Sequence, residues 1–451
     1  MAIIKGPAEW RSVLLARASA YDPDGSLAEA ERAGAWVTWR KTAPTQSPAS
    51  IIRSVSTADL RGRGGAGYPT GRKWQTVAAQ GSDRRYVVAN GYEADPGAQL
   101  DRTLMETDPH LVLEGLALAA FAVGARESFI AVKATYTTAV RRLRAAIRSA
   151  EEAGYIGQDA LGAGFDLHIE LRELQGAFVL GEETALLRSI EGKRPQPDQR
   201  PPYPAERGLW DKPTVVNNVE TLAAVPWIVA NGGEAYAKLG MNGQAGTTLV
   251  QLGGTVNRAG VAEVPMGIPL RDLLRGVAGG EPRGRLKALF IGGPSGGFLP
   301  PEALDTQLTP GSLSEMGAIM GSGSILALDG TTCLVDLATL MTRFMGDEAC
   351  GKTIPCRIGT RRLYEIGERY ITGRTRPTDQ QLMADLCSDI RDGALCGHEI
   401  SATNPLLSGM RYFRDEFDAH ILRGECPAGV CRPLPPVAAQ TPAAAPVSPR
   451  A

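Results

Sequence analysis

The spacing of apolar and polar residues divides the first half of the chain into alternating strands and helices. Short apolar or alternating runs predict strands at residues 84–90, 128–133 and 165–171. Helical spacing predicts helices at residues 111–123 and 138–153, the second with basic residues on its outer face. This alternation is typical of an α/β protein, and it predicts a layered, Rossmann-like domain over residues 56–240.

The pattern changes after residue 240. Apolar runs at residues 248–252 and 288–292 predict strands, with a short helix at 270–277 between them. We therefore expect a small β-grasp domain over residues 246–330.

The pattern becomes helical towards the C-terminus. Over residues 331–432, apolar positions recur at helical spacing, which predicts a small helical bundle with helices near 333–345, 359–371, 379–392 and 404–421. Residues 1–55 predict a helical arm followed by a Pro/Ser linker at 42–50. The Pro/Ala-rich residues 433–451 predict a disordered tail.

Composition narrows the class of protein. The net charge is −1, from 48 basic and 49 acidic side chains, which favours neither a nucleic-acid nor a membrane-surface partner. The N-terminus lacks the basic-then-apolar layout of a signal peptide. The most apolar window, residues 111–125, is too short to span a bilayer and contains Glu114. We expect a cytoplasmic protein without direct membrane insertion.

A glycine-rich loop at residues 61–74 is the first candidate for chemistry. Glycines there would let backbone N–H groups approach a phosphate closely, and Lys73 adds positive charge. The match of Gly62, Gly64 and Gly67 to a dinucleotide fingerprint is weak, because no apolar strand precedes it. A flexible basic surface loop is the alternative.

Polar turns follow several of the expected elements. Glu93 and Asp95 come directly after the strand at 84–90, where ligands usually bind in α/β sheets. The pair of glutamates at 182–183 opens a helix, where acidic residues also complement the helix dipole. Asn217 and Asn218 can cap a helix or hydrogen-bond a flavin phosphate or ribityl chain.

The chain has seven cysteines, and all of them follow residue 332. This clustering in a large chain favours metal ligation over disulfides. Cys350 and Cys356 lie in one predicted loop, and Cys396 follows 40 residues after Cys356. A complete Cys-x2-Cys-x2-Cys motif with a distant fourth cysteine would indicate an iron–sulfur cluster, but Thr353 stands at the middle position. Inert buried thiols are the alternative.

A second set combines one histidine and three cysteines, Cys333, His420, Cys426 and Cys431. These residue types suit tetrahedral zinc. Simple packing at the end of a helix explains them equally well at this stage.

Together these motifs resemble the flavoprotein family that includes the NADH-oxidising, FMN-binding subunit of respiratory complex I. The family also contains the diaphorase subunits of NAD-dependent formate dehydrogenases and NAD(P)-linked hydrogenases. The resemblance covers about residues 56–431. It is carried by the glycine-rich loop, the turns at 90–97, 181–184, 200–204 and 217–221, and the cysteines.

The resemblance implies three redox groups and their ligands. FMN would be held by Gly62, Gly64, Gly65, Lys73, Asn90, Glu93, Gly181, Glu182, Asn217, Asn218 and Thr221. NAD(H) would contact Tyr68, Asp95, Glu183, Arg200 and Tyr203. A four-iron, four-sulfur cluster would lie in the helical bundle on Cys350, Cys356 and Cys396 with Thr353 at the remaining position; Thr353 or a water could complete it, or the cluster could hold three irons or be absent.

The sequence after the cluster loop, residues 354–359, looks more like the formate dehydrogenase branch. The extended end at 426–431 looks more like the dehydrogenase and hydrogenase branches than minimal complex I. We therefore predict the diaphorase subunit of a cytoplasmic NAD-dependent formate dehydrogenase. Its partners would be a separate molybdenum- or tungsten-dependent catalytic subunit and a small thioredoxin-like 2Fe–2S subunit. The alternatives are the NADH-oxidising subunit of complex I or of a hydrogenase, and a cofactor-poor scaffold subunit.

Overall fold

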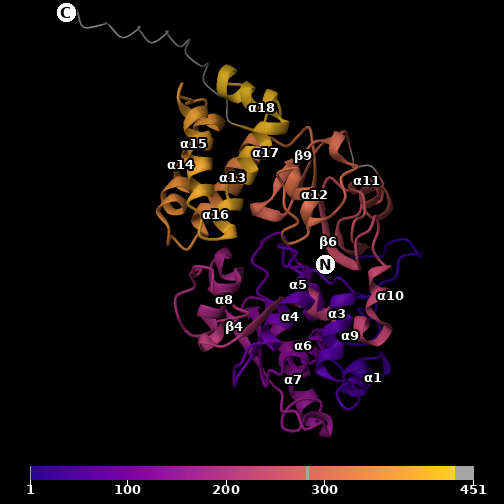
Figure 1. The fold of residues 1–451 in the computed structure, drawn as a ribbon. Coiled ribbons are helices and arrows are strands. Elements are labelled where there is room, and N and C mark those ends of the chain that lie inside the picture. The colour runs from indigo at the N-terminus through magenta and orange to yellow at the C-terminus, as the bar shows by residue number, and fades with distance from the viewer. Residues whose placement is uncertain (1, 281–283, 432–451) are drawn as a thin grey trace, which may run out of the picture.

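The structure, a computed structural model, describes residues 2–280 and 284–431. The predicted tail at 433–451 lies outside the described residues. Figure 1 shows the α/β part at one end of the molecule and the helical C-terminal part at the other, with the second sheet beside both.

A parallel four-stranded sheet forms the centre of the α/β part, as predicted. Its order is β4-β3-β2-β5, with strands at Tyr86–Gly91 (β2), Glu127–Lys133 (β3), His168–Leu174 (β4) and Thr214–Asn218 (β5). Alternate residues of β2 and β3 enter two separate cores, because successive side chains of a strand point to opposite faces. This double burial explains why both strands read as nearly continuous apolar runs.

Helices cover both faces of this sheet. The larger core contains α4 (Thr70–Ala78), α6 (Pro109–Val123), α7 (Thr137–Glu152) and α9 (Val219–Asn231). The smaller core contains α8 (Glu183–Ile190) with two short helical turns, Phe178–Gly181 and Leu209–Asp211. Helix α5 (Leu100–Thr107) begins close after the β2 turn, and α10 (Gly233–Ala237) ends this part.

Residues 1–55 are not the arm and linker that we expected. They form β1 (Ile3–Ile4), α1 (Leu27–Arg32), α2 (Val37–Thr42) and α3 (Pro48–Thr57). Trp36 and Trp39 are fully buried in the larger core, and their backbone amides donate hydrogen bonds of 3.0 Å to the carboxylate of Glu114 on α6. This buried carboxylate is satisfied by distant N-terminal amides, so the N-terminal segment is part of the domain.

The second sheet is mixed, with the order β1-β7-β6-β10-β8-β9. Its strands after β1 are β6 (Thr247–Gly254), β7 (Gly260–Pro265), β8 (Leu286–Ile291), β9 (Gly297–Leu299) and β10 (Ser324–Asp329). The central pair β6 and β10 is parallel, and their outer neighbours β7 and β8 are antiparallel to them. Short helices lie at Leu270–Asp272 (α11), Leu273–Val277 and Pro310–Glu315 (α12), so the β-grasp arrangement is present with one strand supplied by the N-terminus.

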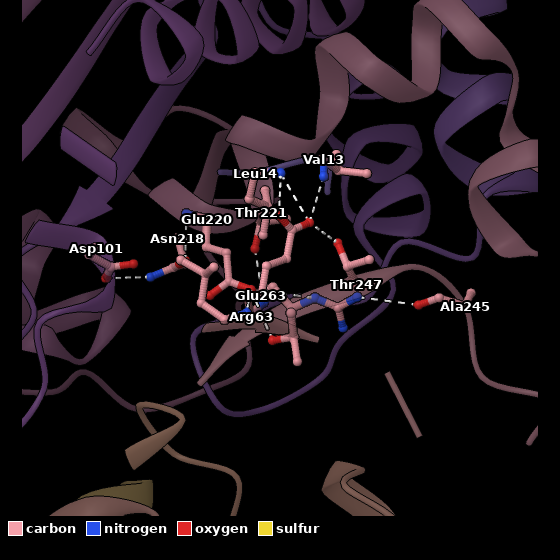
Figure 2. A network of polar contacts seen from close by, with 12 residues as sticks. Val13, Leu14, Arg63, Asp101, Asn218, Glu220, Thr221, Ala245, Thr247 and Glu263 are labelled. Carbon is pink, nitrogen blue, oxygen red and sulfur yellow. Dashed lines mark hydrogen bonds and ion pairs between the residues drawn. The ribbon is translucent and has the colours of Figure 1, made fainter. Parts of the chain in front are cut away.

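Glu263 on β7 joins the N-terminal segment to this sheet. Its carboxylate accepts hydrogen bonds from the backbone amides of Val13, Leu14 and Leu15, at 2.8 to 3.0 Å, and from Thr247 Oγ1 at 2.6 Å. Figure 2 shows the amides of Val13 and Leu14 pointing at the carboxylate, beside the Arg63–Glu220 pair. One buried acid therefore orients the first residues of the chain.

The C-terminal part is helical, as predicted. Its main helices are α13 (Leu334–Asp347), α14 (Thr360–Thr372), α15 (Asp379–Asp392), α16 (Gly397–Ser401), α17 (Asn404–Tyr412) and α18 (Arg414–Asp418), followed by a π-helical turn at Ala419–Arg423. The single helix expected at 404–421 is broken at Phe413, whose φ is −127°. Within the described residues, no helix is both long and apolar enough to cross a bilayer.

Candidate functional site

A cavity of about 1160 Å³ lies where the three parts of the chain meet. All but one of the residues predicted to hold FMN or NAD(H) line it, namely Gly62, Gly64, Gly65, Tyr68, Lys73, Asn90, Glu93, Asp95, Gly181, Glu182, Glu183, Arg200, Tyr203, Asn217 and Asn218. The exception is Thr221. The β-grasp part contributes wall residues such as Gly292, Ser295 and Ser322, and the helical part contributes Arg391, His398 and Asn404.

The glycine-rich loop forms one wall of the cavity. It is closed at its base by hydrogen bonds from the amide of Gly62 to Tyr68 O, 2.9 Å, and from that of Thr70 to Leu60 O, 2.8 Å. In the described part of the chain, the amides of Gly64 and Gly65 donate no hydrogen bond to the protein. Gly65 has φ +103°, where a side chain would also stand 3.2 Å from Gly321 O. Two free amides in a glycine cradle fit a bound phosphate.

Thr221 supports the loop from behind and does not line the cavity. It is fully buried, and its hydroxyl accepts a 2.9 Å hydrogen bond from the amide of Arg63. Arg63 and Lys73 both line the cavity. The Arg63 guanidinium also donates to Ala245 O at 3.3 Å and faces the buried Glu220, so part of its charge is compensated within the fold.

Two of the predicted acidic ligands cap helices. Glu93 accepts hydrogen bonds from the amides of Leu100, Asp101 and Arg102, at 2.6 to 3.0 Å, at the start of α5. Burial raises the pKa of Glu93 to about 7, although these amides act in the opposite direction. Glu182 caps α8 through the amides of Thr184 and Ala185, both at 2.9 Å. Both carboxylates border the cavity while being held in place by helix N-termini.

Charged and aromatic residues also line the cavity. The Glu183 carboxylate lies between Lys73 Nζ, at 3.3 Å, and an Arg200 nitrogen, at 3.0 Å. Tyr68 and Tyr203 are 47% and 53% exposed, which is unusual for aromatic side chains that line a cavity. Exposed aromatic rings beside cations provide stacking and charge contacts for a nucleotide.

The asparagine side chains are fixed by their neighbours. Asn90 Nδ2 donates to Gly181 O at 3.0 Å, which ties the end of β2 to the turn before α8. Asn217 Oδ1 accepts from Trp74 Nε1 at 2.8 Å. Asn218 donates to Asp101 at 2.7 Å and caps α9 through the amide of Glu220 at 2.8 Å.

Asp95 lies against Gly293 and Ser322 of the β-grasp part. Its carboxylate accepts hydrogen bonds from the Ser322 hydroxyl and from the amide of Gly97, the latter at 2.9 Å. Asp101, Ser322 and His398 line the cavity but were not singled out from the sequence. They come from three separate elements, so only the fold brings them to the site.

Three cysteines of the helical part are candidates for the iron–sulfur cluster. Cys356 and Cys396 are buried, and Cys350 is half-buried. Burial, followed by the charges of Glu399 and the other two thiols, raises the pKa of Cys356 to about 12. The charge effects show that Cys350 and Cys396 lie near Cys356, although in the described residues the three thiols do not form a group as compact as the second set of ligands. Thiols with raised pKa values ionise readily when a metal compensates their charge, so the donor types fit an iron–sulfur cluster. The hydroxyl of Thr353 does not face an open position but donates to Glu399 at 2.8 Å.

Gly397 and His398 connect this cluster site with the cavity. They directly follow Cys396, and both line the cavity wall. His398 Nε2 is paired with Met345 O at 2.8 Å, whereas its buried Nδ1 has no partner in the described structure. A cofactor in the cavity would therefore lie next to the segment that holds a cluster thiol.

The second set of predicted ligands forms a compact group. The ligand atoms of Cys333, His420, Cys426 and Cys431 all lie within 4.8 Å of one another. Cys333 Sγ is 3.4 Å from His420 Nε2 and 3.7 Å from Cys431 Sγ. Zinc ligands at the corners of a tetrahedron stand about 3.5–3.8 Å apart, given Zn–S and Zn–N bonds of roughly 2.3 and 2.1 Å. His420 Nδ1 bonds Glu416 O at 2.8 Å, which fixes the ring orientation as in metal sites.

Comparisons with known proteins agree with this geometry. Residues 55–227 match the family described as the Nuo51 FMN-binding domain, and residues 336–420 match the NADH-ubiquinone oxidoreductase-F iron–sulfur binding region. The chain is 40% identical to an NADH-quinone oxidoreductase subunit of Rhizobium meliloti (strain 1021), over 90% of this chain and 97% of the relative. The chain belongs to the complex I 51 kDa-like flavoprotein family.

Other members of the 51 kDa-like family are also similar. The NADP-reducing hydrogenase subunit HndC of Solidesulfovibrio fructosivorans is 44% identical, over 86% of this chain and 80% of the relative. A chain in the crystal structure of an NAD+-reducing [NiFe]-hydrogenase in the H2-reduced state superposes with a TM-score of 0.81 and 30% identity, over 93% of this chain and 67% of that chain.

Family membership confirms the predicted fold class and the predicted cofactors FMN, NAD and an iron–sulfur cluster. The protein is an NAD(P)H-dependent flavin oxidoreductase of the type that serves as a subunit in complex I and NAD-reducing hydrogenases.

Proposed function

We propose that this chain is a diaphorase subunit that exchanges hydride with NAD(H) at a flavin in the cavity and passes single electrons to the neighbouring cluster. The observation that carries this proposal is the continuity between cavity and cluster site: Gly397 and His398 line the cavity and directly follow Cys396. FMN, when bound, supplies the conversion between two-electron hydride chemistry and one-electron transfer.

The residues of the chain act by binding and orientation. The free amides of Gly64 and Gly65, together with Lys73, hold the FMN phosphate. Asn90, Glu93, Gly181, Glu182, Asn217 and Asn218 shape the rest of the flavin site, whereas Thr221 supports the loop from behind. Tyr68 and Tyr203 contact the nicotinamide nucleotide, and Asp95, Glu183 and Arg200 set its charge environment. Hydride transfer needs no side chain that moves a proton, so positioning is the main contribution of the protein.

For the partner enzyme, we propose a cytoplasmic NAD-dependent formate dehydrogenase. The residues after the cluster loop, 354–359, favour this branch of the family, and the Cys426–Cys431 end favours the dehydrogenase and hydrogenase branches over minimal complex I. The complex would then contain a molybdenum- or tungsten-dependent subunit and a small thioredoxin-like 2Fe–2S subunit.

A hydrogenase is the second candidate. It is supported by the 44% identity to the hydrogenase subunit HndC and by the superposition on an NAD+-reducing hydrogenase.

Purification of the native complex tests both proposals. The tagged chain should co-purify with its partner subunits and with a yellow flavin. The purified complex should reduce an artificial dye with NADH as the electron donor. Formate-dependent reduction of NAD+ together with molybdenum or tungsten supports the formate dehydrogenase, and hydrogen-dependent reduction together with nickel or a second iron centre supports the hydrogenase. A colourless chain without NADH-dependent dye reduction would contradict the diaphorase function itself.

We also propose that Cys333, His420, Cys426 and Cys431 bind a structural zinc ion. The four ligand atoms lie within 4.8 Å of one another, and four protein ligands on one zinc ion would leave no position for a substrate. The site would join α13 to the C-terminal segment after Gly424.

A further inference from the structure

The iron–sulfur region contains a buried carboxylate that has no charged partner. Glu399, in helix α16, is only 2% exposed. In the part of the chain that the structure describes, no Lys, Arg or His forms an ion pair with it. A carboxylate withdrawn from water is costly unless a cation or a metal compensates its charge. The position of Glu399 therefore needs an explanation.

The hydrogen bonds of Glu399 reach both segments that carry cluster thiols. Its Oε1 accepts from Thr353 Oγ1 at 2.8 Å, and its Oε2 accepts from the amide of Leu395 at 3.2 Å. Thr353 lies midway between Cys350 and Cys356, and Leu395 directly precedes Cys396. The carboxylate thus lies at the junction of the two segments, at the place where the sequence lacks a fourth cysteine.

We propose that the Glu399 carboxylate is the fourth ligand of the iron–sulfur cluster, alongside the thiolates of Cys350, Cys356 and Cys396. Thr353 is then a positioning residue, whose hydroxyl donates to the carboxylate and holds it in place. The hydroxyl itself is a poorer ligand, because it keeps its proton at neutral pH, whereas a carboxylate binds iron as an anion. This inference rests on the presence of the cluster, and it is independent of the identity of the partner enzyme.

One iron of such a cluster differs chemically from the other three. Three thiolates hold three irons, and the oxygen-bound iron is the most easily lost. Ferricyanide would take one electron from the cluster while one Fe²⁺ leaves, so that [4Fe–4S]²⁺ becomes [3Fe–4S]⁺. The fourth iron should therefore be labile in the wild-type protein and firmly bound once a thiolate replaces the oxygen.

Iron content and EPR spectra of the full-length holoprotein, purified without oxygen, test this assignment. Wild type should hold about four irons per cluster and Glu399→Gln about three, so that ferricyanide should produce the EPR signal of [3Fe–4S]⁺ in the variant by removing one electron and without releasing further Fe²⁺. The matched control Glu302→Gln, at an exposed position outside the helical part, should behave as wild type. Retention of four irons and an unchanged spectrum in Glu399→Gln would overturn the proposal.

A second experiment places a cysteine at position 353, where the cluster motif lacks one. Thr353→Cys should make the fourth iron resistant to ferricyanide, and the double variant Thr353→Cys/Glu399→Gln should return to about four irons. If Glu399→Gln loses the whole cluster, recovery in the double variant supports the ligand assignment, and failure to recover contradicts it. FMN content and NADH-dependent dye reduction are measured in parallel, so that loss of the diaphorase function is separated from loss of the fourth iron.

Discussion

Arg63 Nε lies 3.9 Å from the Glu220 carboxylate, and both side chains are almost completely buried, at 3% and 4% exposure. Glu220, shown with Arg63 in Figure 2, also accepts hydrogen bonds from Thr248 Oγ1 at 2.9 Å and from the amide of Leu249 at 3.0 Å. It therefore joins the glycine-rich loop to β6. Burial nevertheless raises the pKa of Glu220 to about 7, against the effect of Arg63.

This raised pKa predicts a pH-dependent contribution to stability. An acid whose pKa is higher in the folded state binds a proton on folding. The stabilisation that this protonation gives the folded state is complete below the unfolded-state pKa near 4.5, and it is lost as pH rises to the folded-state pKa of about 7. The free energy of unfolding should fall by up to about 1.4 kcal/mol per pH unit across this window because of Glu220. In Glu220→Gln this component is absent. The difference in melting temperature between wild type and variant, measured from pH 4.5 to 8, should therefore shrink or reverse as pH rises; a constant difference would contradict the prediction.

Gly65 should be required for flavin binding. Its φ of +103° strains any residue with a side chain, and a Cβ would stand 3.2 Å from Gly321 O. We expect Gly65→Ala to lose roughly 1–3 kcal/mol of stability in the loop and much of its FMN, measured as the flavin-to-protein absorbance ratio. Gly34→Ala is the matched control, because Gly34 has φ +96° but open space around it. Equal flavin loss in both variants would show that general strain, not the cradle, is responsible.

Glu183 should weaken the binding of NADH. Its carboxylate is paired with two cations that line the cavity, Arg200 at the proposed NAD(H) site and Lys73 beside it at the flavin site. Glu183→Gln frees this positive charge, and about 1 kcal/mol of added attraction would lower the KM for NADH by about fivefold. Steady-state dye reduction at two salt concentrations measures the change, which should be smaller at high salt. The exposed control Glu152→Gln should leave KM unaltered, and an unchanged KM in Glu183→Gln would refute the charge argument.

The Cys/His group should carry its own metal. Cys431→Ser should reduce zinc from about one ion per chain to nearly none, while the iron content stays constant. Elemental analysis of the same sample reports both metals. Cys387→Ser is the control, because this buried cysteine lies outside the group. Loss of iron instead of zinc would mean that the group belongs to an iron centre.

The sequence predicted the elements whose burial follows a local pattern. Strands β2 and β3 and helices α6 and α7 were found within two residues of their bounds, because their apolar positions repeat at the strand or helix period. The strand expected at 165–171 begins three residues later, at His168. Phe165 is not part of the strand. Its side chain packs edge-on against Phe121, so its apolar character made the predicted strand begin too early.

Other features depend on contacts between distant residues, which no local pattern reveals. Strand β5 ends in Asn217 and Asn218, which the sequence predicted as a polar turn. Their hydrogen-bond partners, Trp74 and Asp101, lie more than 110 residues away in the chain, so no local pattern shows that these asparagines belong to a strand. The glycine, acidic and cysteine motifs of the site were visible in the sequence, since each is a short run of unusual residue types. Glu399 was not, because a single acid gains meaning only through its contact with Thr353.

The attachment of the N-terminus to β7 has a consequence for biosynthesis. Ile3 and Ile4 pair with Val261 and Ala262, and Glu263 holds the amide of Val13 across 250 residues of chain. On the ribosome, the segment around Val13 emerges 250 residues before Glu263 and must wait for its partners in β7. Until then its apolar surface is a target for chaperones, and a message truncated before β7 would yield a fragment that proteases remove.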